Sequence, residues 1–142
     1  MQPASSFKIF RVVAWIASIY HIILGLLGTF ASADIVVPIA SSVYGITPQV
    51  NPQFLYMAKF IAAYMLAFGV MMGFVALKPR EHRDLVWAAV ILFGIRVFDR
   101  LVYFNLLQEA FGTDMARNLV TVVPIAIIAI CLLAFRPRLS AA

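Results

Sequence analysis

The chain has 142 residues, of which 64% are hydrophobic and 12% are charged, and its mean hydropathy is +0.99. This composition excludes an ordinary soluble domain and indicates an integral membrane protein. The net charge of +5 would suggest nucleic acid in a soluble protein. Here most of the excess falls at one set of predicted helix ends, so it reports membrane topology and predicts no nucleic-acid partner.

Four apolar stretches are each long enough to cross a hydrocarbon core of about 30 Å. They cover roughly residues 10–33, 53–77, 85–106 and 116–135. Little chain remains outside them, and no linker separates a second unit. The sequence therefore predicts one all-α domain over residues 1–142, an integral membrane four-helix bundle.

The basic residues predict how the bundle is oriented. If the four segments alternate, Arg117 alone lies near one side, and most other basic residues outside the spans lie at the opposite side. Those on the opposite side are Lys8, Arg11, Lys78, Arg80, Arg83, Arg136 and Arg138. We therefore expect both termini in the cytoplasm.

The first apolar segment carries a lone histidine, His21. It can be a hydrogen-bonded core residue, a proton-linked or quinone-binding group, or a metal ligand. The only other histidine, His82, falls in a cytoplasmic loop, which disfavours a bis-histidine haem within one chain. Cys131 is the single cysteine, so no cysteine pair can hold a metal, and we predict no metal site.

The connection over residues 33–52 is long and rich in apolar residues. A polar linker would not have this composition. We expect it to lie on the outer surface of the bundle or in the membrane interface, with a short helix near residues 36–44.

Small residues recur in the first two segments at spacings typical of close helix packing. Gly69 and Gly73 form a Gly-x-x-x-Gly motif, and Gly25 and Gly28 lie in the first segment. Such residues let helix backbones approach closely in lipid. We interpret them as internal packing contacts, with self-association as the alternative.

The third segment carries Arg96, Asp99 and Arg100 near its middle, at i, i+3 and i+4. This spacing places the three residues on one helical face, and intramembrane charges normally face a bundle interior. Counting along antiparallel helices brings Lys59 level with Asp99 and Arg100. One carboxylate cannot neutralise these cations, so the group calls for a further partner.

Several arrangements satisfy this group of charges. Arg96 and Asp99 can form a buried scaffold pair while Lys59 and Arg100 extend to the outer headgroups. Tyr103 and Tyr64 would then supply hydroxyls to the cluster. Alternatively, the arginines bind a lipid phosphate or a small anion, or a partner subunit supplies a carboxylate, or the group forms a proton relay.

Three stretches resemble small bacterial four-helix membrane proteins of the DoxX and BphX-like group. They are Tyr44-Gly45-Ile46 with Pro48, residues 54–73, and Pro79-x-x-His82-Arg83 leading to Gly94-Ile95-Arg96 and Arg100. The resemblance implies a four-helix membrane bundle, and we expect a multi-pass protein of the bacterial inner membrane. It also implies a supporting role beside a quinone-linked oxidoreductase, but it supplies no catalytic residue.

No nucleophile with an oriented base, phosphate-binding loop or paired-carboxylate acid site is present in the sequence, so no catalytic residue is predicted and an enzyme is not favoured. We expect a non-catalytic accessory or interaction subunit of a larger inner-membrane complex. Its charged cluster would bind membrane lipid, a small ligand or a partner helix. The alternatives are a quinone-binding subunit of an oxidoreductase, quinone being the only cofactor considered, and a small organic-anion transporter acting as a homo-oligomer.

Overall fold

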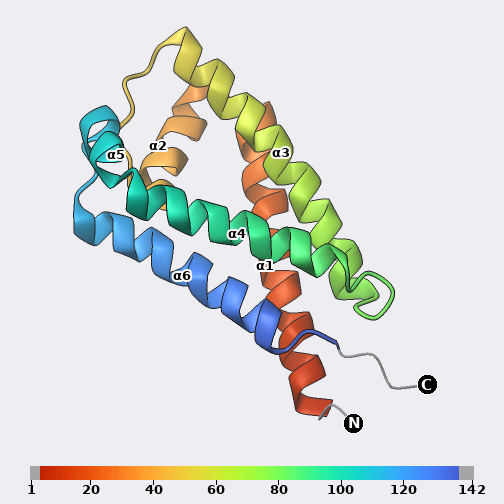
Figure 1. Ribbon diagram of the computed structural model, residues 1–142. Coiled ribbons are helices and arrows are strands. Elements are labelled where there is room, and N and C mark those ends of the chain that lie inside the picture. The colour runs from red at the N-terminus through yellow and green to blue at the C-terminus, as the bar shows by residue number, and fades with distance from the viewer. Residues whose placement is uncertain (1–3, 138–142) are drawn as a thin grey trace.

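The computed structural model describes residues 4–137, which form six α-helices and no β-strand (Figure 1). The helices are α1 (Ala4–Phe30), α2 (Ala33–Tyr44), α3 (Pro52–Leu77), α4 (Leu85–Val102), α5 (Phe104–Phe111) and α6 (Met115–Ala134). The all-α prediction is confirmed. The expected short helix in the long apolar connection is also present, as α2.

Three helices, α1, α3 and α6, are long and apolar enough to cross a membrane. The third predicted segment differs from expectation, because it is not one helix over residues 85–106. Tyr103 leaves the helical conformation, with φ −98° and ψ 27°, and separates α4 from α5. The break allows α5 to turn Leu107 and Phe111 toward the other helices while Gln108 and Glu109 stay exposed.

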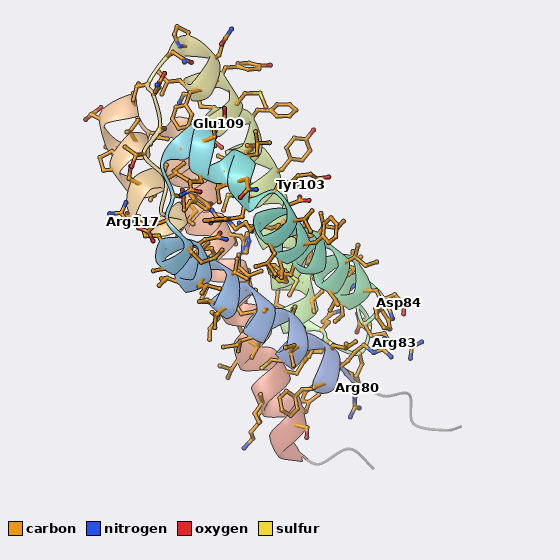
Figure 2. All side chains as sticks on the ribbon, turned by 60° about the vertical axis from the view of Figure 1, so that its left-hand side comes forward. Arg80, Arg83, Asp84, Tyr103, Glu109 and Arg117 are labelled. Atoms are coloured by element: carbon orange, nitrogen blue, oxygen red, sulfur yellow. The ribbon has the colours of Figure 1, made fainter. Side chains whose placement is uncertain are left out.

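The two ends of the molecule differ in the segments and the basic residues that they hold. Both ends of the described chain and the loop 78–84 lie toward one end, and α2 and α5 lie toward the other (Figure 1). Figure 2 shows Arg80, Arg83 and Asp84 at the first end, far from Arg117. Cation–π contacts order basic residues there: the guanidinium of Arg80 lies 5.6 Å from the Phe7 ring and that of Arg136 lies 4.5 Å from the Trp87 ring.

Helices α1 and α3 pack with their backbones almost in contact. A Cβ atom added to Gly25 would lie 2.5 Å from the Leu66 nitrogen, and one added to Gly69 would lie 2.7 Å from the Ile22 nitrogen. The other two candidate packing glycines, Gly28 and Gly73, face Ala62 and Ser18 across the same pair of helices. All four glycines therefore face the contact between α1 and α3, and at Gly25 and Gly69, which meet backbone atoms, a side chain would push the two helices apart.

The same two helices cap each other with cations. Lys59 Nζ on α3 donates to the carbonyls of Thr29 and Ala31 at the end of α1, both at 3.1 Å. Arg11 Nε on α1 donates to the Ala76 carbonyl at the end of α3, at 3.2 Å. Each positive charge meets carbonyls that have no partner inside their own helix and that carry the negative end of the helix dipole.

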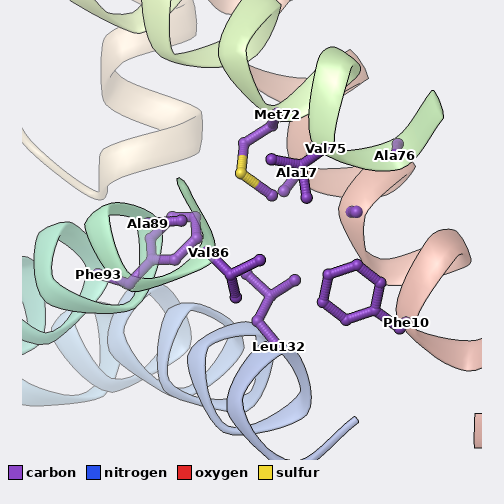
Figure 3. Close-up of a cluster of buried hydrophobic side chains, with 10 residues drawn as sticks. Phe10, Ala17, Met72, Val75, Ala76, Val86, Ala89, Phe93 and Leu132 are labelled. Carbon is purple, nitrogen blue, oxygen red and sulfur yellow. The ribbon is translucent and has the colours of Figure 1, made fainter. Parts of the chain in front are cut away.

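Figure 3 shows the apolar core, whose members include Phe10 near the start of α1 and Leu132 near the end of α6. Side chains from α1, α3, α4 and α6 meet there without polar interruption. The cluster contains Phe10, Ala14, Ala17, Met72, Val75, Ala76, Val86, Ala89, Phe93 and Leu132. This packing holds one end of α4 tightly. The polar residues of α4 lie farther along the helix, away from this core.

Candidate functional site

His21 and Arg96 form the first polar contact of the interior. Arg96 Nη1 lies 3.2 Å from His21 Nε2, and His21 Nδ1 lies 2.7 Å from the Ala17 carbonyl oxygen. An arginine can only donate, so Nε2 accepts and the ring proton sits on Nδ1, where it donates to Ala17. The ring is therefore neutral and both nitrogens are occupied.

This arrangement bears on the expected roles of His21. The ring is buried and makes edge-on contacts with Phe68 and Tyr20, at centroid distances of 4.8 Å and 5.2 Å. No ring nitrogen is left for a haem iron or another metal. Across residues 4–137, no group of three histidine, cysteine or acidic side chains is placed to hold a metal ion.

Arg100 forms the second polar contact, one helical turn from Arg96. Its Nη2 donates to the Tyr44 carbonyl at 3.0 Å, and its Nη1 donates to Asn118 Oδ1 at 3.2 Å. Asn118 returns a bond from Nδ2 to the Arg100 carbonyl at 2.9 Å. Arg100 thus joins α4 to α6 and caps α2, whose last carbonyl belongs to Tyr44.

Two further bonds hold the chain after α2 in place. Thr113 Oγ1 donates to the Gly45 carbonyl at 2.9 Å, and the Thr47 nitrogen donates to the Phe111 carbonyl at 2.9 Å. Gly45 adopts φ 64°, the left-handed conformation that ends a helix and that glycine tolerates best. These contacts fix the Tyr44 carbonyl in front of Arg100.

The scaffold pair of Arg96 and Asp99, one of the arrangements that the sequence allowed, does not form within the described part of the chain. Asp99 is exposed, and Arg96 is bound to His21 instead. The reason is the helical period. Asp99 lies about 100° around the helix from Arg100 and on the far side of Arg96, so a face that turns both arginines inward turns the carboxylate outward.

The sequence left open whether Lys59 and Arg100 extend to the headgroups or face the interior, and the structure separates the two residues. Lys59 reaches outward to the end of α1, whereas Arg100 turns inward. The two tyrosines also lie outside the buried network. Tyr103 is exposed at the α4–α5 turn, and Tyr64 is 63% exposed.

Two cavities adjoin the arginines. The larger has a volume of about 320 Å³ and is lined almost entirely by apolar side chains of α1, α2, α3 and α5, with Arg100 at its edge. The smaller, about 270 Å³, is bordered by His21 and Arg96. They share Tyr44, Ile61 and Met65, so one guanidinium faces each cavity and Tyr44 stands between them.

No side-chain carboxylate balances these two cations. The chain contains six acidic residues, all of which are exposed and none of which pairs with Arg96 or Arg100. They are Asp34, Glu81, Asp84, Asp99, Glu109 and Asp114. The guanidinium groups of Arg96 and Arg100 therefore lie between the helices, and their hydrogen-bond partners are all neutral.

Sequence reasoning missed three residues of this site: Tyr44, Thr113 and Asn118. Asn118 carried a usable signal, because an amide inside an apolar segment is costly unless it is bonded. Tyr44 and Thr113 carried none, since only the path of the connecting segments brings Tyr44 to Arg100 and Thr113 to Gly45.

Comparisons of this chain with protein-family models, curated proteins and solved structures give no significant match. The cavities and their two arginines are therefore the observations from which a function can be argued.

Proposed function

We propose that this chain is a non-catalytic, multi-pass membrane protein that holds an apolar, lipid-like small molecule between its helices and serves as an accessory subunit of a larger membrane complex. The cavity of about 320 Å³ carries the first part of this proposal. Small-molecule sites are typically concave, largely apolar and supplied with a few polar groups that orient the ligand, in volumes from roughly 300 to 1,000 Å³. The larger cavity, with Arg100 at its edge, has these features.

The proposed topology has four crossings, α1, α3, α4 and α6, with both termini in the cytoplasm. Helix α4 has 18 residues and is therefore about 27 Å long, close to the thickness of a hydrocarbon core. The basic residues gathered at the end that holds the termini support the cytoplasmic orientation. The bacterial inner membrane as its location, and the relation to the DoxX and BphX-like group, remain predictions.

A cavity-filling variant tests the ligand directly. Ala58 lines the larger cavity, so Ala58→Trp should occupy the space in which the ligand lies. Ala63→Trp is the matched control, because Ala63 lies on the same helix, is exposed and does not border the cavity. Each protein is extracted with its native lipids, and its unfolding temperature is measured before and after exhaustive washing with detergent.

A bound ligand stabilises the folded state, so washing should lower the unfolding temperature of the unmodified protein and of Ala63→Trp. Ala58→Trp should show no such drop. An equal drop in all three proteins would place the stabilising lipid on the outer surface and contradict the proposal.

The smaller cavity favours a second candidate, the quinone-binding subunit. Its lining combines the Phe68 ring with the Arg96 guanidinium, which can donate to a quinone carbonyl. His21 would act through Arg96, since its own nitrogens are occupied. Leu92→Trp should then remove quinone from gently extracted protein, whereas Ile91→Trp, on the exposed side of α4, should retain it. Quinone-free unmodified protein would rule this candidate out.

A further inference from the structure

We infer that the ligand is a single-chain amphiphile whose anionic head, a carboxylate or a phosphate, lies between Arg96 and Arg100 and whose chain fills the larger cavity. This inference rests on the proposed lipid-like ligand and specifies its chemical class.

The charge of the site is the first argument. Arg96 and Arg100 are one turn apart on α4, at i and i+4, and therefore share a face. All six side-chain carboxylates of the protein are exposed and bonded elsewhere or turned outward. Charges held in a low-dielectric interior without a counter-charge are costly, and an anionic head would supply the missing charge.

The remaining hydrogen-bond donors are the second argument. A guanidinium has five N–H donors. Arg100 uses one on Tyr44 and one on Asn118, and Arg96 uses one on His21. Each therefore keeps donors in the planar arrangement that suits carboxylate and phosphate oxygens. The protein groups already bound are neutral, so an anion would add to these contacts rather than replace an ion pair.

The position of Tyr44 indicates where the anionic head of the ligand lies. Its side chain borders both cavities, and its hydroxyl donates to Met65 Sδ at 3.0 Å. Its backbone carbonyl meets Arg100. The junction of the two cavities is thus the place where both guanidinium groups and one hydroxyl converge.

The volume of the larger cavity limits the number of alkyl chains that a ligand can place in it. Its volume of about 320 Å³ lies at the low end of the range for ligand sites, which suits one alkyl chain better than the two of a phospholipid. Met57 and Ile61 line the cavity and are about half exposed, so it opens along α3 toward the surroundings. A chain could enter from the bilayer by this side.

Photolabelling with competition tests the inference on the unmodified protein. The protein is placed in phosphatidylcholine nanodiscs with a diazirine-bearing dodecanoic acid, irradiated, and its labelled residues are identified by mass spectrometry. Competitors are dodecanoate, dodecyl phosphate, dodecanol and inorganic phosphate. We expect saturable labelling of residues that line the larger cavity, such as Ile39, Ala58 and Leu107.

Dodecanoate and dodecyl phosphate should both protect the cavity, and dodecanol should need roughly ten- to one-hundred-fold higher concentration, since it lacks the charge-assisted bonds. Arg96→Gln should weaken protection by dodecanoate to a similar extent. Arg117→Gln should not, because that arginine is exposed and bound to Asp114. Arg96→Gln is the preferred variant because Arg100 also holds α2.

Each contrary outcome has a distinct meaning. Equal protection by dodecanol and dodecanoate would overturn the anionic head while leaving the lipid-like ligand in place. Protection by inorganic phosphate as strong as that by dodecyl phosphate would show that the site binds a free anion, and it would overturn the claim that the ligand has an alkyl chain. Absence of saturable labelling in the cavity would overturn both this inference and the proposed function.

Discussion

Arg96 donates to His21 Nε2 across 3.2 Å, and the two residues come from helices far apart in the sequence. The bond fixes the orientation of the guanidinium at the smaller cavity and the protonation of the ring. We expect His21→Leu to leave an inner N–H of Arg96 unpaired and to lower the free energy of unfolding by about 1–3 kcal/mol.

The variant His21→Gln checks this account, because an amide oxygen can accept from Arg96 and should recover part of the loss. His82→Leu, in the loop 78–84, is the control and should change stability little. Unfolding in mixed micelles measures all three. Equal stability of His21→Leu and the unmodified protein would mean that the bond contributes nothing.

The contact between Gly69 and Ile22 leaves no room for a side chain. Gly69→Ala should therefore force α1 and α3 apart and destabilise the protein by about 1–3 kcal/mol. Gly94 is the matched control, since a Cβ there would meet nothing within 4 Å. Gly94→Ala should be neutral or stabilising by up to about 1 kcal/mol, through helix propensity. The opposite order of the two variants would refute the packing argument.

The cap that Lys59 places on α1 should matter locally rather than globally. Lys59→Met keeps the length of the side chain but removes the bonds to Thr29 and Ala31, at a cost of roughly 0.3–2 kcal/mol. Hydrogen exchange should become faster in the last turn of α1 and stay unchanged in α6. Lys8→Met, an exposed lysine at the other end of α1, should leave that turn protected.

Asn118 should be more important than its position in an apolar helix suggests. Asn118→Leu removes both bonds to Arg100 and leaves a guanidinium donor and a carbonyl unpaired, so we expect a loss of about 2–5 kcal/mol. Asn105→Leu, at an exposed site on α5, is the control. A stable Asn118→Leu protein would show that Arg100 finds another partner.

The sequence indicated the features that depend on local pattern. Apolar length predicted the helices, and the cost of intramembrane charge singled out Arg96 and Arg100 as candidate site residues, but the sequence left open whether Arg100 faces inward or extends to the headgroups. Spacing alone could not choose the partner of Arg96, because Asp99 is three residues away and His21 lies on another helix. Nor could it predict the break at Tyr103 or the meeting of Tyr44 with Arg100, since both depend on how the outer connections pack.

Native mass spectrometry of the protein extracted gently from its own membrane tests the central claim most directly. The account predicts one small amphiphile per chain on the unmodified protein and on Ala63→Trp, and none on Ala58→Trp, whose new side chain fills the cavity. A bare unmodified protein, or the same bound mass on Ala58→Trp, would contradict the claim that this cavity is a ligand site.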